Sequence, residues 1–227
     1  MTYAELKTNI ANYLNRSDLT SEIDMFIDNT EAELNRKLRV KEMIKRATAT
    51  ADGQYLSVPS DWLEAINIEI TSNDFRPLMQ MSIESLDVYR KSINNKTGQP
   101  IYYALVDDTI ELAPTPDSSY TLQLTYFGKI DALSDSNTSN FVSNTHPDVY
   151  LYGSLKHASV FLMEDERAPL FNAQFEKSLE EMRLQQEKAE FGKGSLVQRR
   201  RTYGKSRKNI HYWNNNQEEK WLDLAII

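Results

Sequence analysis

The pattern of apolar and polar positions predicts two helices at the start of the chain. One apolar stripe with helical spacing runs through residues 6–14, and a second runs through residues 23–38. Thr2 and Glu5 have the spacing of a capping box at the start of the first helix. Because the polar turn between the stripes is short, we expect an antiparallel helix pair whose apolar faces need a further partner to cover them.

In the middle of the chain the period of the pattern changes to two, which predicts β-strands. Ile66, Ile68 and Ile70 alternate with polar residues, and similar runs occupy residues 101–105 and 120–126. The central part is therefore expected to be a mostly antiparallel β region of roughly five or six strands.

Turn signals separate these strands. Asp52-Gly53 is a dipeptide typical of hairpin turns, and Asp107-Asp108 is expected to form the turn before the next strand. Residues 82–93 predict a short helix between strands, and residues 133–143 a polar loop after them.

Helical spacing returns after this loop. Pro147 suits the first position of a helix that runs to about residue 163. This helix is apolar on several sides, which indicates a central place, and Gly153 and Ser154 would let another helix approach closely. A last long helix is predicted over residues 166–191.

These elements predict an α+β fold with an inserted domain. Residues 1–43 and 144–191 would form a helical bundle, residues 44–143 a mostly antiparallel β domain, and residues 192–227 an extended C-terminal arm. In the bundle, the uncovered stripes of the two helix pairs would meet. Seven residues are expected to be buried there together: Phe26, Ile27, Leu34, Leu155, Leu162, Phe171 and Phe175.

The C-terminal arm differs from the rest of the chain in charge and pattern. Residues 192–227 carry eight Lys/Arg and three Asp/Glu, whereas the first 191 residues carry 18 Lys/Arg and 30 Asp/Glu. The net charge of the whole chain is −7. The arm has no helical or strand period, yet it is rich in aromatic and aliphatic residues, so we expect it to dock onto a partner. The residues predicted to bind that partner are Arg199, Arg200, Arg201, Lys205, Arg207, Lys208, Tyr212, Trp213, Trp221, Leu222, Leu224, Ile226 and Ile227.

The residue types offer little for catalysis. The chain has no cysteine and three histidines, and we expect no catalytic, cofactor or metal site. Asp107-Asp108 and Glu164-Asp165-Glu166 are carboxylate clusters, but turn and helix-end roles explain them. No apolar run approaches the ~18 residues of a membrane span, and residues 1–6 lack the features of a signal peptide. A protein made in the cytoplasm without a membrane partner is therefore expected.

Several motifs keep a fixed order along the chain. They are residues 27–39, Val58-Pro59-Ser60-Asp61-Trp62-Leu63-Glu64, Pro100-Ile101-Tyr102-Tyr103, Leu112-Ala113-Pro114-Thr115-Pro116, Leu124-Thr125-Tyr126-Phe127, Asn140-Phe141-Val142, Pro147-Asp148-Val149-Tyr150-Leu151-Tyr152-Gly153, Ala158, Glu164-Asp165-Glu166-Arg167-Ala168 and Phe175. Together and in this order, they resemble the motifs of the head-to-tail adaptor proteins of tailed bacteriophages, also called connector or tail tubular A-like proteins. The resemblance covers residues 1–191, and the arm beyond residue 192 matches no pattern of this family. Phe141 follows Asn140 where the family often has tryptophan, a conservative change in a loop.

The resemblance implies a structural, non-enzymatic protein of the virion neck, assembled in the host cytoplasm. It implies a ring, commonly of twelve subunits, that sits between the portal protein and the tail nozzle or tail tube. Double-stranded DNA would pass through the ring without sequence-specific binding, and the acidic body suits this passage because it repels phosphates. Two alternatives remain open: a virion-associated enzyme that degrades cell-wall polysaccharide, and a nucleic-acid-binding protein that acts through its basic arm.

Overall fold

The computed structural model describes residues 1–72, 76–164 and 166–190. Residues Met1–Gln186 form one compact unit, in which helices and strands each build a core of their own. The fold is α+β, as the sequence predicts.

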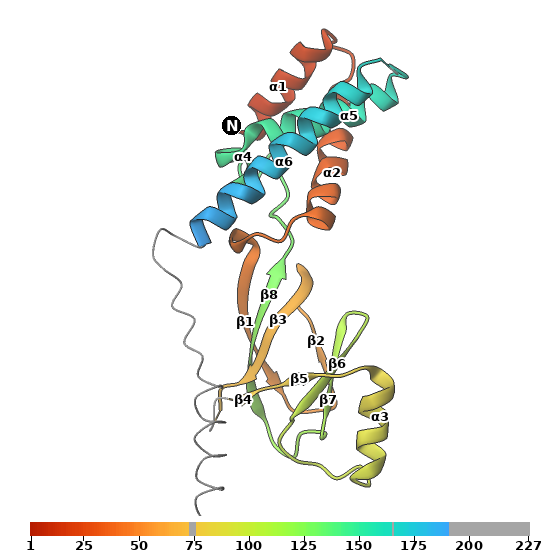
Figure 1. Cartoon of the computed structure of the whole chain (residues 1–227), viewed down its shortest axis with the longest axis vertical. Coiled ribbons are helices and arrows are strands. Elements are labelled where there is room, and N and C mark those ends of the chain that lie inside the picture. Colours follow the sequence, from red (N-terminus) through yellow and green to blue (C-terminus); the bar gives the residue numbers. More distant parts are fainter. Residues whose placement is uncertain (73–75, 165, 191–227) are drawn as a thin grey trace, which may run out of the picture. The chain divides into compact units, whose positions relative to one another are not determined.

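The helical core is built from both ends of this unit's sequence (Figure 1). Thr2 accepts a hydrogen bond from the Glu5 backbone and Glu5 accepts one from the Thr2 backbone, so the predicted capping box is confirmed. Pro147 is the first residue of its helix, also as predicted. Among the described residues the bundle helices are α1 (Tyr3–Leu14), α2 (Thr20–Lys37), α4 (Phe141–Thr145), α5 (Pro147–Phe161) and α6 (Ala168–Glu190).

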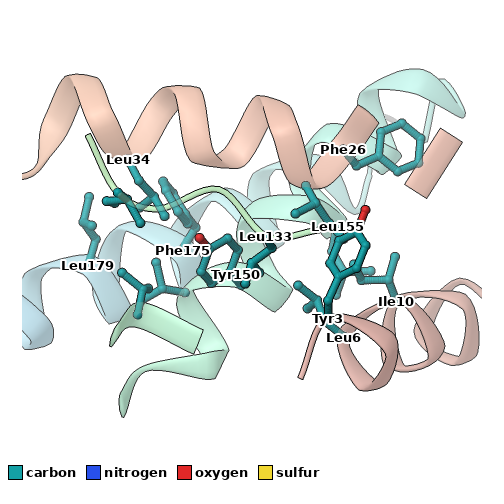
Figure 2. Packing of buried hydrophobic residues seen from close by; sticks show 14 of the residues in the cluster. Tyr3, Leu6, Ile10, Phe26, Leu34, Leu133, Tyr150, Leu155, Phe175 and Leu179 are labelled. Atoms are coloured by element: carbon teal, nitrogen blue, oxygen red, sulfur yellow. The ribbon is translucent and has the colours of Figure 1, made fainter. Parts of the chain in front are cut away.

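The core of the bundle contains side chains from all of these helices. Figure 2 shows part of it, with labelled side chains from α1, α2, α5 and α6. Five of the seven residues that the sequence placed there are fully buried, among them Phe26 and Phe175. Leu162 and Phe171 are only partly buried at the edge of the cluster. The prediction that they are buried with the others is therefore wrong in degree, because both lie near the turn between α5 and α6 and not beside the middle of the bundle.

At Gly153, helix α5 lies very close to α2 and α6. A Cβ atom at this position would lie 2.4 Å from Cγ2 of Thr30 on α2 and 3.1 Å from the ring of Phe175 on α6. The hydroxyl of Thr30 is 3.4 Å from that of Ser154. The small residues of α5 thus permit close packing, as predicted, because a side chain at Gly153 would occupy space that Thr30 already fills.

The strands form two four-stranded sheets within the described residues. Sheet 1 has the order β1-β8-β3-β4 and sheet 2 the order β2-β7-β6-β5. The β5–β6 pair is parallel, and the other pairs are antiparallel. The strands are β1 (Ile44–Ala51), β2 (Tyr55–Ser57), β3 (Trp62–Ile70), β4 (Arg76–Pro77), β5 (Met79–Gln80), β6 (Tyr102–Val106), β7 (Thr109–Ala113) and β8 (Tyr120–Gly128).

One predicted hairpin is wrong and one predicted turn is confirmed. β1 and β2 flank Asp52-Gly53 but do not pair: β1 joins β8 in sheet 1, and β2 joins β7 in sheet 2. The chain bends at this dipeptide, but the strands before and after it belong to different sheets, because each pairs with a strand that is distant in sequence. Asp107, with φ of 53°, occupies the turn of the β6–β7 hairpin, as expected.

The two sheets pack face to face and a helix covers the outer face of one of them. Ile68, Ile110 and Leu124 are among the buried residues between the sheets. Alternate positions of sheet 2, such as Ala104, face α3 (Ile83–Ser92), whose Leu86 is fully buried. This sheet-sheet-helix layering explains why β6 and β7 carry buried apolar residues on both faces.

Two further expectations need correction. Ile66 does not share a buried face with Ile68 and Ile70, because the register of β3 on β8 shifts between Ala65 and Asn67 and leaves Ile66 44% exposed. Such a bulge adds one residue and breaks the alternation. The loop predicted over residues 133–143 ends earlier than expected, because Asn140 caps α4 through the Ser143 backbone.

Candidate functional site

The carboxylate clusters singled out in the sequence have structural roles where they are described. Asp107 and Asp108 lie in the β6–β7 turn. Glu164 lies 3.5 Å from Arg167 beyond the end of α5, while Asp165 is outside the described residues. In residues 1–72, 76–164 and 166–190, no three His, Asp or Glu side chains gather as metal ligands would. No helix among them is long and apolar enough to cross a bilayer.

A buried polar network ties the chain that returns from β8 to the helical core. Glu31 Oε1 accepts hydrogen bonds from the Tyr150 hydroxyl at 3.0 Å and from the Leu133 backbone at 2.8 Å. Asn140 donates to the Tyr150 hydroxyl at 2.7 Å. Burial raises the pKa of Glu31 and that of Tyr150 above their ordinary values. Every polar atom named here has a partner, so the network holds the segment in place and offers no open site.

A cluster of charges joins α2, α5 and α6. Glu33 accepts hydrogen bonds from Lys156 and lies 2.8 Å from Lys37, which also contacts Glu176. Burial alone would raise the pKa of Glu33, but the bonds from the two lysines outweigh it and lower that pKa to about 2. His157 Nε2 lies 3.3 Å from Glu33 Oε2. Burial and the charge of Lys156 lower the pKa of His157, which favours the neutral imidazole.

A third cluster spans sheet 1 at the level where β8 ends. Lys45 of β1 lies 2.8 Å from Asp61 and 3.0 Å from Asp131. It passes over Gly128, where a Cβ would lie 2.7 Å from the lysine stem. Tyr126 donates to Asp61 at 2.9 Å. Burial alone would raise the pKa of Asp61, yet the bonds from Lys45 and Tyr126 lower it. The cluster thus fixes β1, β8 and the start of β3 to one another.

A buried ion pair fastens α3 to sheet 2. Arg90 of α3 binds the carboxylate of Glu111 on β7 and donates to the Leu112 carbonyl at 2.6 Å. Gln54 donates to the same carboxylate at 3.0 Å. Burial opposes ionisation of Glu111, but the bond from Arg90 outweighs it and lowers the pKa of the carboxyl. Like the other clusters, this pair orients structural elements against one another.

Exposed apolar side chains at the turn between α5 and α6 were missed in the sequence. Val160 is 67% and Met163 is 86% exposed, and Phe161 and Leu170 beside them are also exposed. The helical pattern of residues 147–163 did contain a signal, because it is apolar on several sides. That pattern predicts burial, and the prediction holds for Tyr150 and Leu155 but not for the last turn of α5.

All thirteen residues that the sequence predicts to bind a partner lie in residues 199–227, outside the described residues. Their role stays a prediction from sequence.

No curated protein matches the chain. The model of a family described as SU10 adaptor protein matches residues 1–201, which include both sheets and all described helices. This match confirms the resemblance that the ordered motifs indicate: the chain belongs to the SU10 adaptor protein family, and it is a head-to-tail adaptor of a tailed bacteriophage.

Proposed function

We propose that this adaptor is a non-enzymatic structural protein of the virion neck that assembles into a closed ring between the portal and the tail. The family match over residues 1–201 carries the proposal. The polar clusters support it, since they rigidify the junctions between elements and do not assemble reactive groups. Side-by-side contacts between copies would be heterologous and would close into a ring, commonly of twelve subunits.

In this proposal, DNA passes through the ring without sequence-specific binding. The first 191 residues carry 30 acidic against 18 basic side chains. A wall of negative net charge repels phosphates, so the genome slides and does not adhere.

The C-terminal arm, residues 192–227, is proposed to dock onto a partner in the neck. The basic run of residues 199–208 would lie on an acidic protein surface, and residues 221–227 would anchor in an apolar groove. Nucleic acid is the alternative partner for the basic run, because clustered arginines with nearby tyrosines also suit phosphate binding and base stacking.

Electron microscopy of the chain mixed with portal protein tests the ring. We expect closed rings attached to the portal, with the mass of the free chain close to that of a monomer because assembly needs the portal as a template. A tight two-fold dimer as the sole assembly in particles would contradict the proposal. Salt-sensitive DNA binding by a monomer would favour the nucleic-acid alternative, and hydrolysis of cell-wall material would favour an enzyme.

A further inference from the structure

Sheet 1 has two edges that no described strand covers. β1 pairs with β8 along Ile44–Ala51, and no strand within the described ranges lies on its other side. β3 pairs with β8 on one side, while β4 reaches only Glu69 and Ile70 on the other. Residues 62–67 of β3 are thus also an edge. Free backbone N–H and C=O groups at such edges are ready to meet another chain.

The direction of the two edge strands suits head-to-tail contact. β1 and β3 are both antiparallel to β8, so they run parallel to each other. Neighbours in a ring of twelve are related by a rotation of only about 30°, so strand directions are nearly kept from copy to copy. That angle is close to the ordinary twist between adjacent strands of a sheet. A two-fold axis would instead place β1 antiparallel to its own copy.

The register of sheet 1 places matching residues at one level. Through their shared partner on β8, Ile44 lies level with Glu64, and Arg46 lies level with Asn67. Ile66 is the extra residue of the bulge between these two levels. Ile44 is 43% and Ile66 is 44% exposed, so each edge presents one isoleucine to solvent at nearly the same height.

The charges of the two edges are complementary. Arg46 of β1 is exposed and forms no ion pair with any described residue. Glu64 of β3 is 59% exposed and bonds Arg39 at 2.9 Å on the surface. A solvent-screened pair of this kind is weak and can be shared with a second cation.

We propose that the β1 edge of one copy docks against the β3 edge of the next copy at the same level, so that Ile66 lies between Ile44 and Arg46 and the long side chain of Arg46 reaches back to Glu64. This contact rests on the ring of the proposed function and names the surfaces that would form it. Side chains carry it, because the bulge prevents a continuous backbone ladder at Ile66. The bulge on β3 and the charges of Lys45 and Arg46 on β1 also protect the free chain from edge-to-edge aggregation through these strands.

Cysteine cross-linking tests the contact, since the natural chain has no cysteine. The double variant Ile44→Cys with Ile66→Cys is oxidised in rings assembled with portal protein. Within one copy, two strand spacings of about 4.8 Å separate these positions, and a disulfide needs Cα atoms within about 7 Å. We therefore expect a reducible ladder of covalent multimers and no internal disulfide. Each single variant, and Tyr55→Cys with Ile66→Cys as a matched exposed pair, should give no ladder.

The outcomes separate this contact from the ring itself. Rings seen by microscopy without a ladder would overturn the contact and leave the ring intact. Covalent dimers from Ile44→Cys alone would indicate β1 against β1 and would also overturn it. If no rings form with portal protein, the proposed function fails and the contact fails with it.

Charge reversal gives an independent measurement. Arg46→Glu should lower the fraction of chain in rings by about tenfold, because it places like charges together at the contact. Glu64→Arg added to that variant should restore assembly. If Arg46→Glu assembled as well as the natural chain, the pairing of Arg46 with Glu64 would be wrong. The pairing would also be contradicted if the double variant did not recover assembly.

Discussion

The hydroxyl of Tyr150 on α5 donates a hydrogen bond to Oε1 of Glu31 on α2 across 3.0 Å. The same hydroxyl accepts from Asn140 at 2.7 Å. The hydroxyl oxygen of Tyr150 therefore joins α2, α5 and the segment that leads from the β region.

Tyr150→Phe should destabilise the chain by ~1–3 kcal/mol, because it leaves a buried carboxylate and a buried amide each without one partner. Urea unfolding followed by circular dichroism measures the loss. Tyr152→Phe is the matched control: it lies on the same helix, is partly buried, and has no side-chain hydrogen bond to a described residue. Equal losses in the two variants would show that the network contributes nothing.

His157 should make stability depend on pH in the weakly acidic range. Its pKa in the folded chain is lowered from 6.5 by burial and by Lys156, so the unfolded chain binds the proton more readily. Stability is then fully present above pH 6.5 and falls as the pH drops through that value towards the folded pKa. His157→Gln should flatten this part of the profile of unfolding free energy against pH. An unchanged slope in His157→Gln would contradict the assignment.

Gly153→Ala should destabilise the bundle although alanine favours helices. The new Cβ would lie 2.4 Å from Cγ2 of Thr30, and overpacking of a core typically costs about 1–3 kcal/mol. Thr30→Ser removes that methyl group and keeps the hydroxyl, so the double variant should recover part of the loss. A thermodynamic cycle of the two single variants and the double variant measures this coupling. Additive effects would mean that the two side chains do not compete for space.

Phe26→Ala and Phe171→Ala should differ in cost. Phe26 is 1% exposed, so its truncation should cost ~3–5 kcal/mol. Phe171 is only partly buried against the same cluster, and its truncation should cost clearly less. Thermal unfolding of both variants measures the two losses of stability. A loss for Phe171→Ala as large as that for Phe26→Ala would contradict the peripheral place of Phe171.

Deletion of residues 221–227 should leave a folded monomer with the stability of the full chain and impair its docking in the neck. Binding should depend on Trp221 and the aliphatic residues more than on the basic run, because ordering the arm costs conformational entropy that apolar anchors offset. Co-sedimentation with assembled necks measures docking. Normal incorporation of the shortened chain would refute the docking arm, and Arg199–Arg201 would then gain weight as a nucleic-acid contact.

Much of the fold could be predicted from neighbouring residues. The capping box of Thr2 and Glu5, the helix start at Pro147 and the turn at Asp107 depend on interactions within a few positions, and each is confirmed. The Asp52-Gly53 hairpin was wrong because strand pairing depends on β7 and β8, more than fifty residues away. The exposure of Ile66 was missed because a bulge has no signature in an alternating pattern.

By itself, the sequence determined the α+β class, the β region between two helical ends, and the family. These features depend on local periodicity and on the order of motifs, which can be read without knowing any contact between distant residues. Only the tertiary structure decided which charged and polar residues that are distant in sequence become partners. Glu33 meets Lys156 across 123 positions, and Lys45 meets Asp131 across 86. Hydrogen bonds and ion pairs form over a few ångströms in space, so their partners emerge only once the helices and sheets have brought distant residues together.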